Sequence, residues 1–164
     1  MRWLVLGLAI VAAGCDTKTP EEVAAETARA VAEVEAHQKP PPEQIVPDKI
    51  GYREIEKFDL FGAGCNFAPD GGGMGAVAIA QSDRGYMVVD RELVRFAADK
   101  GSPELPYLAR RKYDGMKHSF TLDLDPKSGE QSGMETTDYR GRLTVRDGQD
   151  NIVYDARGMV QCGA

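Results

Sequence analysis

Hydrophobic and polar residues alternate through much of the second half of the chain. The clearest case is the segment 119–125, in which Phe120, Leu122 and Leu124 fall on one face. A period of two is typical of an antiparallel strand with one buried and one solvated face. Short apolar runs predict further strands at residues 77–80, 86–89, 93–96, 143–146, 152–154 and 159–162. Many short strands predict a mainly β domain, a small antiparallel β sandwich or barrel.

Turn-forming residues separate these runs. Residues 90–92 lie between two of them and predict a hairpin with a three-residue turn, and residues 147–151 predict another tight turn. The Pro- and Gly-rich stretches 69–73 and 126–133 are predicted to be loops. Within this region, a short helix is suggested only for residues 91–100.

A helical pattern dominates the segment that precedes the β region. Thr19 is a potential N-cap, Pro20 suits the first helical position, and Glu22 completes a capping box. Helix-forming residues continue to His37, and the prolines at 40–42 end the helix. Its apolar stripe is thin and consists of small side chains. We interpret it as a solvated spacer of about 27 Å; self-association or docking on another envelope protein is the alternative.

The first residues are predicted to be a secretory leader. One positive charge, at Arg2, precedes an apolar run, which is shorter than the roughly 20 residues of a membrane-spanning helix. The residues Ala-Ala-Gly-Cys that end at Cys15 resemble the lipobox of bacterial lipoproteins. The resemblance implies a diacylglyceryl group on the Cys15 thiol and cleavage before it. The alternative is an ordinary secretory leader, cut near Ala13 or Gly14, that leaves a free thiol.

This processing divides the chain into three parts. Residues 1–14 are the signal peptide, residues 15–47 a lipid-anchored helical and Pro-rich tether, and residues 48–164 the antiparallel β domain. The expected location is the cell membrane or the outer membrane, with the domain in the periplasm. The net charge of −6 lacks the basic excess of a nucleic-acid-binding protein. Because the tether is acidic and anionic headgroups repel it, we expect lipid to hold the protein at the membrane.

Two cysteines, Cys65 and Cys162, lie near the two ends of the β domain. In an oxidising envelope such a pair is usually a structural disulfide. Closing a loop of nearly a hundred residues contributes up to about 4.7 kcal/mol in the chain-entropy model. The alternatives are a metal site or a redox pair. A metal needs further ligands, and the chain has only two histidines.

Candidate catalytic and binding residues are few. His118 opens an alternating strand, where the adjacent Ser119 points to the opposite face, and His37 lies in the tether. The glycine-rich residues 71–75 lack the helix and lysine of a phosphate loop. The carboxylates of 123–130 and 147–151 faintly resemble calcium loops, but loop and hairpin geometry explains them. The basic cluster 110–112 is flanked by Tyr107 and Tyr113. We expect its charges to be solvated; contact with an acidic partner or a glycan is the alternative.

These patterns favour a non-catalytic cell-envelope lipoprotein that binds or scaffolds another envelope protein or a cell-wall component, with no catalytic residue, cofactor or metal. A second hypothesis is an inhibitor of a cell-wall hydrolase, because the general plan is similar to that of the membrane-bound lysozyme inhibitors. That family carries a Ser-Gly-x-x-Tyr loop. Here Gly101 and Ser102 stand in reverse order and Tyr107 is further away, so no inhibitory residue is carried over. A third hypothesis is an enzyme that acts on an envelope polymer.

Overall fold

The computed structural model describes residues 18–37, 41–73 and 75–164. The leader and Cys15 lie outside the described residues. One compact unit comprises Pro42–Ala164, and the other contains helix α1 (Pro20–His37). None of the helices in the described ranges is long and apolar enough to cross a membrane.

Helix α1 begins as the sequence predicts. The backbone N–H of Thr19 donates to the Glu22 carboxylate at 2.8 Å, and the backbone N–H of Glu22 donates to the Thr19 hydroxyl at 3.3 Å. These two bonds form the predicted capping box. They also lower the pKa of the Glu22 carboxyl, because the hydrogen bonds from Thr19 favour its charged form.

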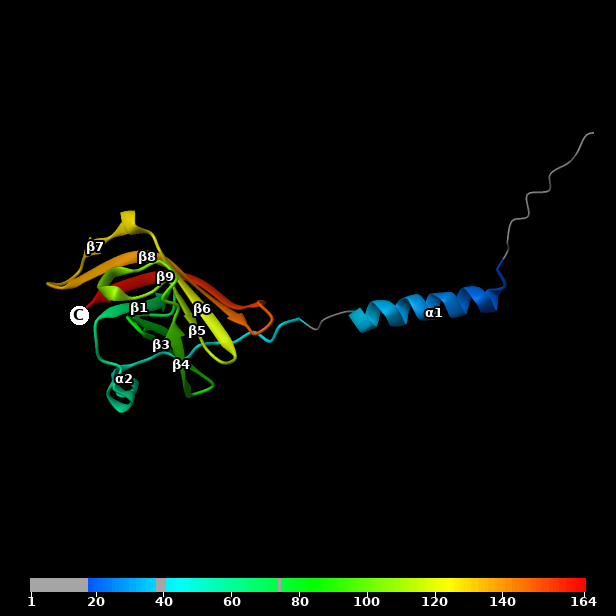
Figure 1. The fold of residues 1–164 in the computed structure, drawn as a ribbon, viewed down its shortest axis with the longest axis horizontal. Helices are drawn as coiled ribbons and strands as arrows, with labels where there is room; N and C mark the ends of the chain where they lie inside the picture. The colour runs from blue at the N-terminus through cyan, green and yellow to red at the C-terminus, as the bar shows by residue number, and fades with distance from the viewer. Residues whose placement is uncertain (1–17, 38–40, 74) are drawn as a thin grey trace, which may run out of the picture. The chain divides into compact units, whose positions relative to one another are not determined.

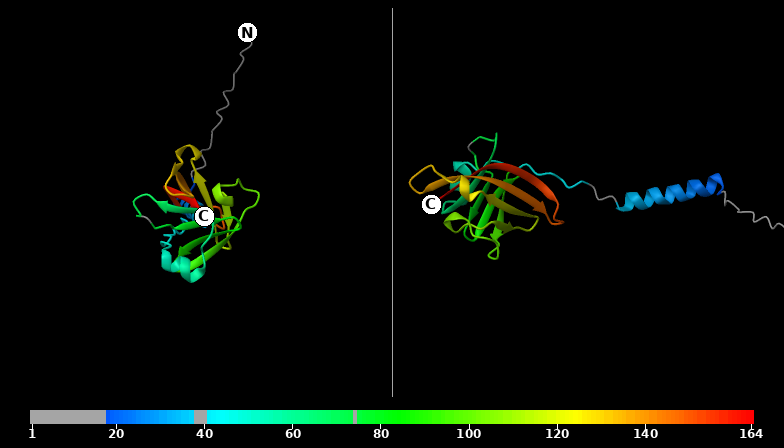
Figure 2. Two further views of the ribbon diagram at one scale, coloured as in Figure 1. Left: turned by 90° about the vertical axis from the view of Figure 1, so that its left-hand side faces the viewer. Right: turned by 90° about the horizontal axis from the view of Figure 1, so that it is seen from above.

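The β domain is an eight-stranded antiparallel barrel (Figures 1 and 2). Successive strands pair from β1 to β6, β6 then pairs with β8, β8 with β9, and β9 with β1. The sheet therefore closes on itself, so a barrel and not a sandwich is formed. Its strands are β1 (Gly64–Pro69), β2 (Ala78–Gln81), β3 (Arg84–Val89), β4 (Glu92–Ala98), β5 (Lys112–Asp114), β6 (His118–Leu124), β8 (Thr136–Asp147) and β9 (Ile152–Gly163). The short β7 (Glu130–Gln131) is an additional strand that pairs with β8.

Two local expectations are corrected by the structure. The suggested helix at 91–100 is strand β4, which pairs with β3 along nearly its whole length. The hairpin between them has a two-residue turn, not three, because Asp90 and Arg91 both have positive φ angles of 53° and 64°. This is the geometry of a type I′ turn, whose twist matches that of the flanking strands.

The sequence did not predict helix α2 (Tyr52–Phe58), which covers part of the outer face of the barrel (Figure 1). Its start is fixed by a hydrogen bond of 2.9 Å from the Gly51 backbone N–H to the Glu54 carboxylate. A second apolar cluster lies between this helix and the barrel. In it, Ile79 on β2 and Val88 on β3 pack with residues that flank or belong to α2. Strand β3 is therefore buried on both faces, which explains its continuous apolar run.

Side chains fill the interior of the barrel. Phe120 is 1% exposed, stacks on Tyr113 with ring centroids 4.7 Å apart, and meets Phe96 edge-on at 5.0 Å. Gly85 makes room for these rings, since a Cβ atom there would lie 2.6 Å from the Phe120 ring. The other inward side chains form a single cluster with them. An interior filled in this way is usual for an eight-stranded barrel of this size.

The predicted disulfide between Cys65 and Cys162 is confirmed. The two residues are direct partners in the pairing of β1 with β9, and neither has exposed surface. The bond therefore joins the first and last strands of the barrel. The short helix η1 (Pro106–Leu108) covers it, with the Pro106 carbonyl oxygen 3.6 Å from the Cys65 sulfur.

The barrel has a proximal end and a distal end. At the proximal end the tether joins the domain: the Ile45 N–H donates to the Val153 carbonyl at 3.0 Å, and Gln44 donates to the Ile152 carbonyl at 3.2 Å. Residues 42–47, predicted as tether, thus belong to the compact unit. At the distal end lie the β4–β5 loop, the β7–β8 turn and the C-terminus (Figure 1).

Candidate functional site

The longest connection between neighbouring barrel strands is the β4–β5 loop, residues 99–111, which we call the distal loop. The Ser102 hydroxyl donates to the Asp99 carbonyl at 2.7 Å and accepts from the Lys112 N–H at 3.2 Å. Backbone bonds of 2.9 Å join Arg111 to Pro103 and Leu105 to Ala109. The loop is therefore held by its own ladder of hydrogen bonds.

The tip of the distal loop has an unusual backbone. Tyr107 and Leu108 have positive φ angles of 56° and 64°, and the Ala109 N–H donates to the Pro106 carbonyl at 3.3 Å. This arrangement is a type I′ turn, whose two central positions favour Asn and Gly. A left-handed conformation costs each bulky residue roughly 1–2 kcal/mol. Strain of this kind is found preferentially at functional sites.

The two strained residues differ in what their side chains do. The Tyr107 hydroxyl donates to the Glu135 carbonyl at 2.5 Å, which fastens the tip to the β7–β8 turn. Leu108 is 61% exposed to solvent. Strain at Tyr107 is thus offset by an internal bond, whereas Leu108 combines strain with an exposed apolar side chain. Leu108 is an exposed apolar side chain at the tip of the loop, in a backbone conformation that the exposed Arg91 shares in the β3–β4 turn.

The base of the distal loop is fixed to the barrel core through Tyr113. Its hydroxyl donates to the Gln81 carbonyl at 2.6 Å and accepts from the Arg110 N–H at 2.7 Å. Tyr113 is fully buried and belongs to the interior cluster, although the sequence placed it beside a basic surface cluster. Burial raises the pKa of Tyr113 to about 12, because the phenolate would have to form away from water.

This burial predicts a pH dependence of stability. Below pH 10 the Tyr113 phenol is protonated in both the folded and the unfolded chain, so its contribution is fully present. Between pH 10 and about 12 the Tyr113 phenol ionises in the unfolded chain but not in the folded one. The free energy of unfolding therefore falls as the pH rises. In an absorbance titration of the tyrosines, we expect Tyr113→Phe to remove a late component, that is, a phenol that ionises only well above pH 10. Tyr52→Phe, at an exposed residue, is the control. Because burial also raises the pKa of Tyr154, the contradicting result is a late component that Tyr113→Phe leaves undiminished.

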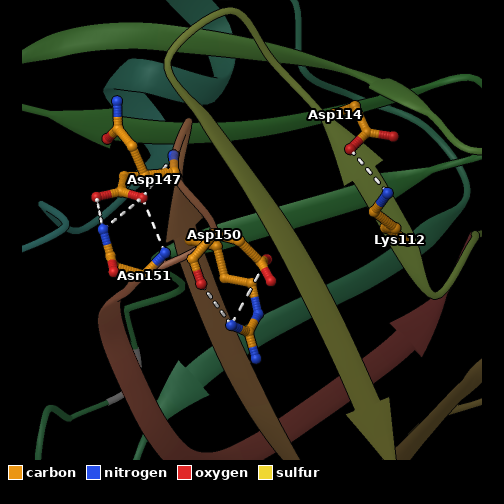
Figure 3. Close-up of polar contacts among 7 residues, drawn as sticks. Lys112, Asp114, Asp147, Asp150 and Asn151 are labelled. Carbon is orange, nitrogen blue, oxygen red and sulfur yellow. Dashed lines mark hydrogen bonds and ion pairs between the residues drawn. The ribbon is translucent and has the colours of Figure 1, made fainter.

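The predicted basic cluster 110–112 does not form a net positive patch. Arg110 pairs with Glu104 at 3.0 Å and Arg111 with Asp123 at 2.5 Å. Lys112 pairs with Asp114 at 3.1 Å, as Figure 3 shows. Each of the three cations therefore has a carboxylate partner. Among the described residues, the only buried side-chain nitrogen or oxygen atom without a hydrogen-bond partner is Nε of Arg110.

The turn at 147–151 is the predicted hairpin turn (Figure 3). The Asp147 carboxylate accepts from the backbone N–H groups of Gln149 and Asn151, both at 2.9 Å, and from the Asn151 side-chain amide at 3.0 Å. The bond from the Asn151 side chain is the main cause of a lowered Asp147 pKa. The carboxylate oxygens thus stabilise the turn.

The other candidate ion site, residues 123–130, is also organised by internal bonds. Asp123 pairs with Arg111, and Asp125 accepts from the Lys127 N–H at 3.0 Å to begin the short helix η2 (Pro126–Ser128). Across residues 18–37, 41–73 and 75–164, no group of three or more His, Cys, Asp or Glu side chains is placed to hold a metal ion.

The remaining candidate residues belong to elements other than the distal loop. His118 and Ser119 begin β6, are half-buried, and pair with Asp147 and Arg146 of β8. His37 is the last residue of α1. In the glycine-rich loop, Gly71 has a positive φ angle, and a strand follows the loop as expected.

The stretch 101–107, compared above with lysozyme inhibitors, lies within the distal loop. Its two hydroxyl groups, on Ser102 and Tyr107, are both engaged in internal hydrogen bonds. Sequence reasoning missed the neighbouring Leu108. The only signal was its place after Pro106, because Tyr and Leu are not turn-forming residues.

The chain matches no protein-family model, and neither a curated protein nor a solved structure matches it.

Proposed function

We propose that this protein is a non-catalytic, lipid-anchored protein of the cell envelope whose barrel presents a binding surface to another envelope protein or a cell-wall component. The observation that carries the proposal is the combination of a filled interior with a constrained distal loop. Because the interior is occupied by side chains, ligand contacts fall to the outer surface, and the distal loop is an ordered part of that surface.

The anchor in this proposal is the lipobox-like Cys15. Two or three acyl chains give a stable attachment, where a single chain would be marginal. Along α1 the residues from Pro20 to Glu35 are all exposed, as expected of a spacer helix in water. The tether joins the proximal end of the barrel, so the distal loop is carried on the end remote from the attachment.

The variant Cys15→Ser tests the anchor. Cells of the native host that are fed an alkyne-tagged fatty acid should label the wild-type protein and fail to label Cys15→Ser, because the thiol that receives the lipid is gone. The variant should also retain its leader, since cleavage follows lipidation. Met116→Ala, at an exposed turn residue, is the labelled control. An unlabelled wild-type protein and normal cleavage of Cys15→Ser would instead identify an ordinary secretory leader.

The distal loop also supports the second candidate, an inhibitor of a cell-wall hydrolase. Its tip is tightly turned and fastened on both sides, which suits insertion into an enzyme cleft. At micromolar concentration, an inhibitor of this kind should slow lysozyme digestion of bacterial cell walls, and Leu108→Gly should relieve the effect. An unchanged digestion rate with the wild-type protein removes this candidate and leaves the general proposal standing.

A further inference from the structure

We propose that the outer face of strands β8 and β9 binds a carboxylate group of a cell-wall polymer, and that Arg157 is the residue that contacts it. The inference rests on the proposed function, because it names the chemical group by which the barrel would recognise a cell-wall component. Its evidence is a pair of arginines that face each other across the two strands.

Arg142 and Arg157 are direct partners in the pairing of β8 with β9, and both are exposed. Side chains at such positions have Cβ atoms about 5 Å apart, and like charges there destabilise a sheet. Across the strand pairings of the described residues, this pair alone sets two basic residues directly opposite each other. The second arginine is therefore not explained by the stability of the sheet.

Within the pair, the carboxylate partner belongs to Arg142. Its guanidinium donates two hydrogen bonds to Asp155, the one from Nε at 2.6 Å, and the Thr144 hydroxyl donates to Asp155 at 3.2 Å. The bond from Arg142 is the main cause of a lowered Asp155 pKa, to which the charge of Arg157 adds a minor part. Within the described ranges, the Arg157 side chain has no ion pair or hydrogen bond. Its N–H donors are therefore free to bind a ligand.

A second ion pair is adjacent to Arg157. Arg140 lies two residues from Arg142 on β8, diagonal to Arg157, and pairs with Asp70 at 2.9 Å. The Asp70 backbone N–H donates to the Arg157 carbonyl at 2.9 Å, which places this carboxylate beside β9. The surroundings of Arg157 thus hold three exposed guanidinium groups and two carboxylates. One further negative charge would balance them.

The next carboxylates on this face have partners of their own. Asp123 on β6 pairs with Arg111 at 2.5 Å, and Asp138 on β8 accepts from the Gln161 amide at 3.0 Å. Neither is bonded to Arg157, so the balancing charge would come from a ligand.

The charge balance favours a carboxylate over a phosphate. An arginine fork binds a carboxylate through two parallel hydrogen bonds, as Arg142 already binds Asp155. A phosphate monoester carries roughly two negative charges at neutral pH, and Asp155 and Asp70 would repel the second. Because a single exposed ion pair is weak, a polymer that repeats the carboxylate is the favoured ligand, since its effective concentration at the site is high.

The first part of the test measures binding to peptidoglycan, whose peptide chains carry free carboxylates. The full protein, purified in detergent, should sediment with insoluble peptidoglycan. Arg157→Gln should weaken this binding by up to about fivefold, the effect of an exposed ion pair. Arg157→Glu should abolish it, because the introduced carboxylate repels the ligand. Arg95→Glu has the same net charge, at an exposed residue opposite Tyr86 on β4; it is the control and should bind like the parent.

Peptidoglycan whose carboxylates have been converted to amides should no longer sediment the wild-type protein. Unchanged sedimentation with the amidated polymer, or of Arg157→Glu with the native polymer, would overturn the inference. So would a wild-type protein that stays in solution, which is the result expected if this face meets an acidic protein instead.

The second part measures stability. Arg157→Gln should leave the midpoint of thermal unfolding unchanged or raise it by up to about 4 °C, because the repulsion from Arg142 is relieved. Arg95→Gln should leave the midpoint unchanged. A fall of several degrees in Arg157→Gln alone would show that Arg157 supports the fold, and would overturn the inference.

The two proposals fail separately in this design. Fatty-acid labelling in cells of the native host reports the anchor. A protein that is labelled but shows no Arg157-dependent sedimentation retains the proposed function and loses the inference. A protein that is not labelled loses the lipid anchor, whatever its binding to peptidoglycan shows.

Discussion

Replacing both cysteines of the disulfide, in the double variant Cys65→Ala/Cys162→Ala, is expected to lower the free energy of unfolding by about 3–5 kcal/mol. The two residues are 97 positions apart, so the bond removes much of the freedom of the unfolded chain. It also joins β1 to β9, where the barrel closes between its first and last strands. Without it, the last strand is held by its hydrogen bonds and side-chain packing.

Denaturant unfolding of the oxidised protein and of the double variant measures this difference. Met116→Ala, at an exposed residue, leaves both the anchor and the disulfide intact; it is the control and should unfold like the parent. Because both disulfide cysteines are fully buried, we also expect a reductant to leave the bond intact until the barrel unfolds. A loss of less than about 1 kcal/mol in the double variant would mean that the unfolded chain gains little freedom when the bond is absent.

Truncating the central aromatic residue of the interior, in Phe120→Ala, should lower the free energy of unfolding by about 3–5 kcal/mol. Phe120 is 1% exposed and packs between Tyr113 and Phe96. A closed barrel limits how far its strands can move inward, so that the space left by the ring stays partly empty. The cost then includes a cavity as well as the lost burial.

The same denaturant experiment measures this loss, with Met116→Ala as an exposed control that should change stability by no more than about 0.5 kcal/mol. The outcome bears directly on the proposed function. A large loss supports an interior that serves as a packed core. A neutral Phe120→Ala would mean that the interior tolerates empty space, and binding inside the barrel would have to be considered.

The sequence predicted those parts of the fold that depend on local patterns. Strand β6 was predictable because Phe120, Leu122 and Leu124 alternate with polar residues. The capping box of α1 and the turn at 147–151 have side-chain signals within a few residues of one another. The disulfide followed from the number of cysteines and the expected compartment.

Features that depend on distant residues were not predictable. The choice of a barrel over a sandwich rests on the pairing of β6 with β8 and of β9 with β1. Helix α2 has seven residues, which is too short for a clear period. Leu108 has a left-handed backbone within a loop closed by bonds between residues several positions apart, and Tyr-Leu carries no local signal for it. By contrast, β5 alternates as Lys112, Tyr113 and Asp114, a pattern that could have placed Tyr113 inside the barrel.

The intact mass of the protein, purified from membranes of its native host, tests the central claim most directly. The proposed function requires a mass that corresponds to cleavage before Cys15 plus acyl chains. Reduction under denaturing conditions should raise this mass by about two daltons, since one disulfide becomes two thiols. A mass without acyl chains would contradict the lipid anchor, and a mass unchanged by reduction would contradict the bond between Cys65 and Cys162.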